Sequence, residues 1–209
     1  MNLCLVNQKG GVGKTTLAVN LASCCARAGN RVRVIDADPQ GSLLQWQSIS
    51  GTEAFDVLHV PSRTLHRQMK SLAKGYHHIV IDCPPALGDI TTSILKAAEL
   101  AVIPVGPSPL DVWSSRETVD LVAETMKKNR RLRACMLVSR KIARTRIARE
   151  ARGALAEYGL PVCSVEISQR IAYVEALLSG QSVLTYAGRS PAAEEIRMLC
   201  RELYEGQRR

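Results

Sequence analysis

A glycine-rich segment near the start of the chain has the composition of a phosphate-binding loop. Residues 9–16 read Lys-Gly-Gly-Val-Gly-Lys-Thr-Thr, after the apolar run 3–6 and before a helical pattern. Glycines let successive backbone N–H groups point at one spot, where the following helix adds the positive end of its dipole. Lys14 is placed to reach the β and γ phosphates, and the Thr15 hydroxyl to bind Mg²⁺. The predicted nucleotide-binding residues are Gly10, Gly11, Val12, Gly13, Lys14, Thr15 and Thr16.

This loop departs from the general P-loop pattern at two positions. Gln8 stands where that pattern has a glycine, and Lys9 adds a second lysine. Segment 7–16 resembles the deviant Walker A motif of the ParA/MinD ATPases, whose signature lysine lies at the position of Lys9. The resemblance implies ATP hydrolysis with ATP and Mg²⁺ as cofactors and Lys14 in a catalytic role. It also implies that Lys9 reaches across a nucleotide-sandwich dimer to phosphates held by the other subunit, whereas the alternative is a solvated loop lysine.

Two further segments place carboxylates directly after apolar strands. Asp36 and Asp38 follow the run 32–35, and Asp82 follows the run 78–81. An open parallel sheet presents its ligand-binding loops at the strand ends, so these carboxylates should face the phosphates. Asp82 resembles Walker B and is the expected Mg²⁺ ligand, with Thr15. In the family, the counterpart of Asp38 orients the attacking water and that of Asp36 lies nearer Mg²⁺, but either residue could instead form a turn or cap a helix.

A proline-rich loop and the charge of the chain indicate further contacts. Residues 104–111 form a rigid loop that resembles a segment of small plasmid-partition ATPases, which implies that Pro107 adjoins the nucleotide. Arg140 and Lys141 follow an expected strand, so either could lie beside the adenine ring, where the Arg140 guanidinium could stack on it. The net charge is +9, and Glu150 is the only acid among the basic residues of 127–152. This stretch is either a solvated face or a surface for sequence-independent DNA binding, which the resemblance favours. The DNA-contact candidates are Lys141, Arg144, Arg146, Arg149 and Arg170.

Apolar strands and helix-like segments alternate along the chain, which predicts an α/β fold with a mostly parallel sheet flanked by helices. The expected strands are 2–6, 32–36, 78–82, 100–105, 134–138 and 161–165. The clearest expected helices are 15–28, 114–128, 144–158 and 192–205. With the loop of 9–16, this is expected to be a three-layer P-loop NTPase fold. The absence of a linker or repeat predicts a single domain over 1–209, without the N-terminal helix-turn-helix of larger partition ATPases.

Composition argues against several other classes of protein. The seven cysteines form no Cys-x-x-Cys pair, so a metal or redox motif is not expected and the thiols are interpreted as small buried hydrophobes. No signal peptide and no apolar stretch of membrane-spanning length is recognisable, which predicts a cytoplasmic protein.

The resemblance also implies a working cycle. A ParA-type ATPase forms an ATP-dependent homodimer that binds nonspecific nucleoid DNA and is released when a ParB-like partner stimulates hydrolysis, in plasmid or chromosome partition. Positioning of a non-DNA cargo stays open as an alternative. A MinD-like membrane cycle is a further alternative, but the acidic residues of 192–205 make a core-packing last helix the preferred interpretation.

Overall fold

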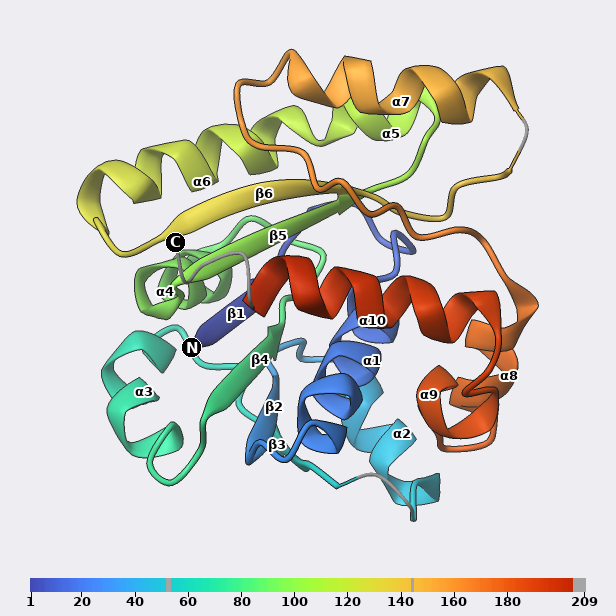
Figure 1. Cartoon of the computed structure of the whole chain (residues 1–209). Coiled ribbons are helices and arrows are strands. Elements are labelled where there is room, and N and C mark those ends of the chain that lie inside the picture. Colours follow the sequence, from blue (N-terminus) through green and yellow to red (C-terminus); the bar gives the residue numbers. More distant parts are fainter. Residues whose placement is uncertain (52–53, 144, 205–209) are drawn as a thin grey trace.

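One parallel sheet organises the molecule, whose computed structural model describes residues 1–51, 54–143 and 145–204 (Figure 1). Its strand order is β3-β2-β4-β1-β5-β6, and every pair of neighbours is parallel. The strands are β1 (Asn2–Leu5), β2 (Val32–Asp36), β3 (Asp56–His59), β4 (His78–Asp82), β5 (Leu100–Val105) and β6 (Arg133–Val138). This arrangement confirms the predicted α/β P-loop NTPase fold.

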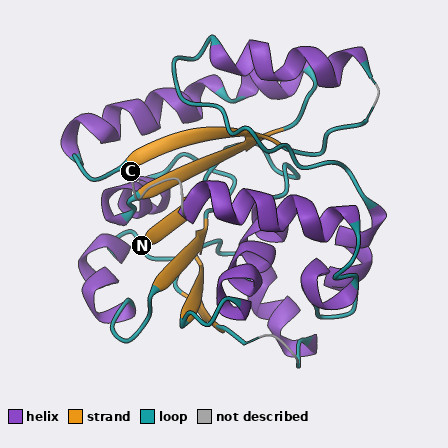
Figure 2. Ribbon diagram, viewed as in Figure 1, coloured by secondary structure: helices purple, strands orange, loops and turns teal. Residues whose placement is uncertain are grey.

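Helices cover both faces of the sheet and make a three-layer structure (Figure 2). One face carries α1 (Lys14–Arg27), α2 (Ser42–Ile49), α8 (Ile171–Leu178), α9 (Val183–Tyr186) and α10 (Pro191–Tyr204). The other carries α3 (Leu65–Leu72), α4 (Asp89–Ala97), α5 (Pro109–Ser114), α6 (Arg116–Lys128) and α7 (Arg146–Ala156).

The alternation of side chains along each central strand explains why there are two cores. On β1, Leu3 and Leu5 pack into the core beneath α1 and α10, whereas Cys4 points into the core beneath α4 and α6. All three side chains are fully buried. Strands buried on both faces require apolar residues at consecutive positions, which is the pattern of 3–6.

The register of the sheet brings the predicted carboxylates to one edge. Asp36 at the end of β2 is opposite Asp82 at the end of β4, and Asp82 is opposite Leu5 at the end of β1. The loop of 9–16 follows β1 directly, so the phosphate-binding backbone and both aspartates meet at the carboxyl ends of three adjacent strands.

The structure corrects several predicted elements. Segment 161–165 is not a strand: Val162 makes only an isolated bridge to Met136, beside the edge strand β6. Strand β3 was not expected, because only four residues form it and its side chains alternate between exposed and half-buried. The helix expected over 114–128 is divided at Ser115 into α5 and α6. Of the other expected helices, residues 144 and 205 lie outside the described residues.

Candidate nucleotide-binding site

The loop between β1 and α1 has the backbone conformation that its glycines permit. Gly11 and Gly13 adopt positive φ angles of 73° and 93°, and Gly13 is the N-cap of α1. A residue with a side chain is strained in this left-handed region, so glycine is required at both positions. The loop presents its N–H groups at the N-terminus of a helix of 14 residues, where an anion is stabilised.

Lys14 and its neighbours line a cavity of about 260 Å³ beside the phosphate-binding loop, called here the phosphate cavity. Its lining residues are Gly10, Gly11, Gly13, Lys14, Thr15, Thr16, Asp38, Cys83 and Pro85. The Lys14 ammonium donates to the carbonyl oxygens of Asn7, at 2.9 Å, and Lys9, at 3.1 Å. Burial lowers the pKa of this amine, because the charged form is poorly solvated there. An anion bound in the cavity would supply the negative charge that stabilises the protonated form of Lys14.

Thr15 and Asp82 form the part of the site that suits Mg²⁺. The Thr15 hydroxyl donates to Oδ2 of Asp82 at 2.6 Å, while Oδ1 of Asp82 is buried and has no hydrogen-bond partner in the described structure. Burial raises the pKa of Asp82 to about 7. A cation would neutralise this carboxylate and use its free oxygen, which fits the role predicted for both residues. Among the described residues no group of three metal-ligating side chains forms, so Mg²⁺ would also need phosphate oxygens and water.

Asp36 and Asp38 differ in what their carboxylates contact. Asp36 is fully buried and accepts backbone hydrogen bonds from Asp38 at 3.1 Å, Leu43 at 3.0 Å and Leu44 at 3.4 Å. It therefore anchors the first turn of α2, which is the capping role that the sequence left open, and its place in the water shell of Mg²⁺ stays a prediction. Asp38 accepts from the Gln40 N–H at 3.0 Å and lines the phosphate cavity.

Lys9 lies at the rim of the site and is held within its own chain. Its ammonium forms an ion pair with Asp111, whose carboxylate also accepts a hydrogen bond from Ser108 at 2.8 Å. Pro107 lines a cavity of about 210 Å³ between this pair and Arg140. Pro107, which was predicted to adjoin the nucleotide, thus lines the same cavity as Lys9, Gly10 and Val12 of the phosphate-binding loop.

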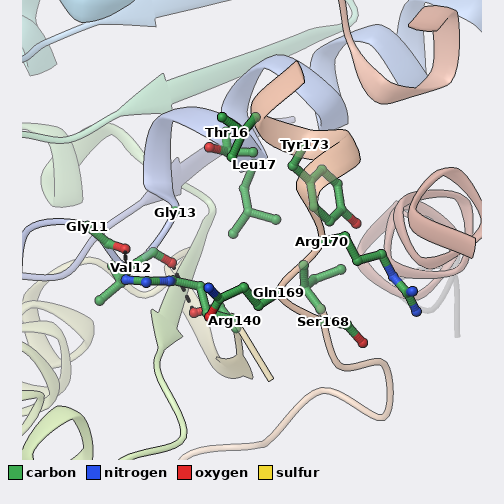
Figure 3. A pocket seen from close by; sticks show the side chains of 13 residues that line it. Gly11, Val12, Gly13, Thr16, Leu17, Arg140, Ser168, Gln169, Arg170 and Tyr173 are labelled. Atoms are coloured by element: carbon green, nitrogen blue, oxygen red, sulfur yellow. Dashed lines mark hydrogen bonds between the residues drawn. The ribbon is translucent and has the colours of Figure 1, made fainter. Parts of the chain in front are cut away.

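A larger cavity of about 390 Å³ adjoins the same loop on the side of α8 (Figure 3). Arg140 adopts a positive φ of 53° and donates to the carbonyl oxygen of Gly11 at 2.8 Å. Leu17, Gln169 and Tyr173 also line this cavity. Its size and its position next to the phosphate cavity suit the nucleoside part of a ligand. Gln169 and Tyr173 were not predicted as lining residues, because only the folded chain brings 167–174 against the loop of 9–16.

Comparison with known proteins decides the family. A model of the CobQ/CobB/MinD/ParA nucleotide-binding domain matches residues 3–183. The chain belongs to this family. The ParA/MinD resemblance of the loop is thereby confirmed over most of the chain.

Two relatives of the ParA/MinD type align along almost the whole chain. The maintenance of carboxysome distribution protein A of Halothiobacillus neapolitanus is 32% identical over 206 residues, which cover 96% of this chain and 95% of that protein. The chromosome-partitioning ATPase Soj of Thermus thermophilus is 31% identical, and the match covers 96% of this chain and 94% of Soj.

Solved structures share the fold of this ParA/MinD-family chain. Apo McdA from Cyanothece superposes with a TM-score of 0.78 at 19% identity, and the match covers 97% of this chain and 98% of the McdA chain. MinD from Pyrococcus horikoshii, complexed with Mg-ADP, superposes with a TM-score of 0.75 at 20% identity, and the match covers 98% of this chain and 96% of the MinD chain. Its ligand agrees with ATP and Mg²⁺ as the cofactors predicted for this family member.

The predicted DNA contacts are not all free basic groups. Lys141 pairs with Glu166, and Arg170 donates to Glu195 at 2.6 and 3.1 Å. In Figure 3 the Arg170 guanidinium points away from the phosphate-binding loop. DNA contact by Lys141 and Arg170 stays a prediction, and both residues also hold the fold together.

Two of the remaining candidates lie on α7. Arg146 and Arg149 are exposed on this helix, and Arg146 pairs with Glu150 at 2.7 Å. Arg144 lies outside the described residues.

Proposed function

We propose that this chain is a ParA-type positioning ATPase that hydrolyses ATP slowly in an ATP-dependent homodimer. The observation that supports this most directly is that Lys14, Thr15 and Asp38 line one cavity, where the Thr15 hydroxyl donates to Asp82, and that Lys9 lines the neighbouring cavity. Phosphoryl transfer depends chiefly on positioning and on positive charge around the phosphates, and these residues supply both.

Each residue has a defined task in the proposed reaction. Lys14 stabilises charge on the transferred phosphoryl group, and Asp38, which lines the same cavity, orients the attacking water. Thr15 and Asp82 hold Mg²⁺, which supplies further charge neutralisation when bound. Lys9 breaks its ion pair with Asp111 and binds the phosphates of the nucleotide held by the other subunit. A site completed in this way hydrolyses slowly until a partner protein reorganises it.

The DNA-binding step is proposed for the ATP dimer. Arg146 and Arg149 on α7 present positive charge to solvent, and duplication in a dimer doubles the number of phosphate contacts. Because these contacts do not recognise bases, the dimer would bind DNA throughout the nucleoid. The proposed location of the protein is therefore the nucleoid, within the cytoplasm.

The cargo is proposed to be DNA, a plasmid or a chromosome, recruited through a ParB-like adaptor that stimulates hydrolysis. Similarity to the chromosome-partitioning ATPase Soj supports this assignment. A second candidate is a non-DNA cargo, which is favoured by the similarity to a carboxysome distribution protein over 96% of this chain.

A MinD-like membrane cycle receives less support. The apolar residues of α10 are buried against the core: Ile196 and Leu199 are fully buried and Leu203 is 3% exposed. Among the described residues, no helix is long and apolar enough to cross a membrane.

The experiment that tests this proposal combines phosphate release with fluorescence anisotropy of a random-sequence DNA duplex. Anisotropy is measured in ATP, in ADP and without nucleotide, each at two salt concentrations. The proposal expects slow phosphate release and DNA binding that needs ATP and weakens with salt. Equal binding in all three states would contradict the coupling between nucleotide and DNA. An ATP-dependent protein that binds vesicles but no DNA would support the membrane cycle instead.

A further inference from the structure

The two residues that follow β6 contact the phosphate-binding loop, although β5 lies between β6 and β1 in the sheet. The Ser139 hydroxyl donates to the carbonyl oxygen of Val12 at 2.9 Å. The Arg140 guanidinium donates to the carbonyl oxygen of Gly11 at 2.8 Å (Figure 3). The carbonyl groups of two consecutive loop residues are therefore fixed by side chains that are more than a hundred residues away in sequence.

These two carbonyl groups determine the direction of the N–H groups that follow them. In a trans peptide unit the C=O and N–H bonds point in opposite directions. The Gly11 carbonyl shares its peptide unit with the N–H of Val12, and the Val12 carbonyl shares its unit with the N–H of Gly13, so both N–H groups point away from Ser139 and Arg140. Within the described part of the chain neither N–H donates to a protein acceptor, and Gly13 lines the phosphate cavity.

Arg140 has a backbone conformation that is unfavourable for a residue with a side chain. Its φ of 53° is the one positive φ at a non-glycine position among the described residues. Such conformations persist where the surrounding structure holds them, and they concentrate at functional sites. The flanking backbone is held on both sides: the Ser139 N–H donates to Val105 at 2.8 Å, and the Lys141 N–H donates to Ile167 at 2.9 Å. The side chain that reaches the loop thus starts from a fixed and strained position.

The two contacts differ in burial. Ser139 is 2% exposed, whereas Arg140 is exposed. Removal of a buried donor leaves its acceptor without a partner, but water can replace an exposed donor. The Ser139 contact should therefore contribute more than the Arg140 contact.

We propose that Ser139 and Arg140 are positioning residues that turn the N–H groups of Val12 and Gly13 toward the phosphates of the nucleotide before it binds. Donors that already point at the site need no reorientation when the anion arrives, which strengthens binding. The inference rests on the nucleotide site of the proposed function. It gives the Arg140 side chain a task at the phosphates and not at the adenine ring.

The experiment compares two ligands, Mg-ADP and Mg-pyrophosphate, by competition against a fluorescent ADP. Pyrophosphate has no base, so a loss that it shares with ADP arises at the phosphates. Ser139→Ala should weaken both ligands about tenfold and Arg140→Ala should weaken both about threefold, as expected for a buried and an exposed hydrogen bond. Ser139→Thr and Arg140→Lys keep a donor and should restore most of the affinity.

A spectroscopic measurement reports on the loop itself. Hydrogen bonding to phosphate moves an amide proton to higher frequency in the NMR spectrum, so ADP should shift the Val12 and Gly13 amide protons in the wild type. These shifts should be smaller in Ser139→Ala and Arg140→Ala.

A further variant separates backbone strain from the hydrogen bond. Glycine adopts a positive φ without strain, so ligand-free Arg140→Gly should melt at a higher temperature than Arg140→Ala. It also lacks the donor, and it should therefore bind both ligands no more tightly than Arg140→Ala.

Two controls remove similar donors elsewhere. Thr125 is 5% exposed and donates to the carbonyl oxygen of Leu121 at 2.8 Å, and the exposed Arg152 donates to that of Ser164 at 3.2 Å. Thr125→Val and Arg152→Ala should leave the affinity for both ligands unchanged.

Several results would overturn the proposal. A loss with ADP but not with pyrophosphate would assign Arg140 to the base. Wild-type affinity in Arg140→Gly, or unaltered amide shifts in both alanine variants, would show that the loop needs neither contact. If the wild type bound neither ligand, the nucleotide site itself would be wrong, whereas normal binding in every variant would refute the positioning role alone. The Arg140 variants change an exposed side chain, so they keep the test valid if Ser139→Ala does not fold.

Discussion

The ionised carboxylate of Asp82 suits a bound cation but lowers the stability of the fold when no cation is bound. Its carboxyl is buried at the end of β4, and burial raises its pKa to about 7. Because this value lies above the ordinary 3.8, the unfolded chain releases the proton first, and the folded state loses stability as the pH rises from about 4 to about 7. The strain is relieved when a cation neutralises the carboxylate, which is the role expected of a Mg²⁺ ligand.

This conflict predicts a pH-dependent affinity for Mg²⁺. Protons compete with the metal for the Asp82 carboxylate, so the Mg²⁺ affinity of the ADP complex should fall about tenfold for each pH unit below about 7. Calorimetric titration at about pH 6 and about pH 8 measures it. Asp82→Asn should bind Mg²⁺ weakly at both values and reports the contribution of the nucleotide's own phosphates. A wild type with no steeper pH dependence than Asp82→Asn would contradict the assignment.

At the scale of elements, the loop from β2 to α2 depends on a carboxylate that does not reach the phosphate cavity. Asp36 accepts the N–H groups of Asp38, Leu43 and Leu44 and so fixes both the turn that carries Asp38 and the start of α2. The sequence predicted that the two aspartates lie beside the phosphate-binding loop, because the end of an apolar run marks the end of a buried strand. It could not distinguish a ligand from a cap, because that depends on a helix formed several residues later.

Removal of this carboxylate should destabilise the protein in the absence of any ligand. Asp36→Ala leaves three backbone N–H groups with weaker partners, and we expect a loss of about 2 to 3 kcal/mol in the free energy of unfolding. Urea denaturation without Mg²⁺ or nucleotide measures it, and Asp36→Asn, which keeps one acceptor oxygen, should lose less. If Asp36→Ala unfolded at the wild-type urea concentration, the anchoring role would be wrong.

The last helix provides a second test at this scale. The apolar face of α10 packs on the core with Leu199 fully buried, whereas the adjacent Met198 is 48% exposed. Leu199→Ala should cost roughly 3 kcal/mol of stability through the cavity that it leaves, and Met198→Ala less than about 0.5 kcal/mol. Equal effects of the two substitutions in thermal or chemical denaturation would show that α10 is not docked as described.

The strands that can be predicted from the sequence differ physically from the one that cannot. Strands β1, β2, β4, β5 and β6 are recognisable because burial on one or both faces leaves runs of apolar residues. β3 is a short edge strand with exposed Asp56, and segment 161–165 is apolar because it covers the edge of β6 without joining its ladder. Edge pairing is decided by tertiary contacts that hydrophobic periodicity does not encode.

At the scale of the whole molecule, the positive charge is distributed between structural and solvent-facing groups. Arg170 and Lys141 are engaged by Glu195 and Glu166, while Arg149 is exposed on α7. The net charge of +9 therefore overstates the charge available to a partner, and it is α7 that should carry the phosphate contacts.

This distribution predicts which substitution changes the salt dependence of DNA binding. Arg149→Ala should weaken binding of the ATP form to random DNA and reduce the slope of log affinity against log salt by about 1. Arg63→Ala removes an arginine that is 78% exposed and lies outside α7, so it should leave the slope unchanged. Titrations at several salt concentrations decide between them. Identical slopes for the two variants would exclude α7 as the contact surface.

In the proposed cycle, ATP in this cavity joins two copies of the chain through Lys9, which is paired with Asp111 inside the single chain. Sedimentation equilibrium of Asp38→Ala, which should hold ATP without cleaving it, tests this most directly. We expect twice the monomer mass with ATP and Mg²⁺, the monomer mass with ADP, and the monomer mass in both nucleotides when Lys9→Ala is added. A single mass in every nucleotide state, or a dimer that persists without Lys9, would contradict it.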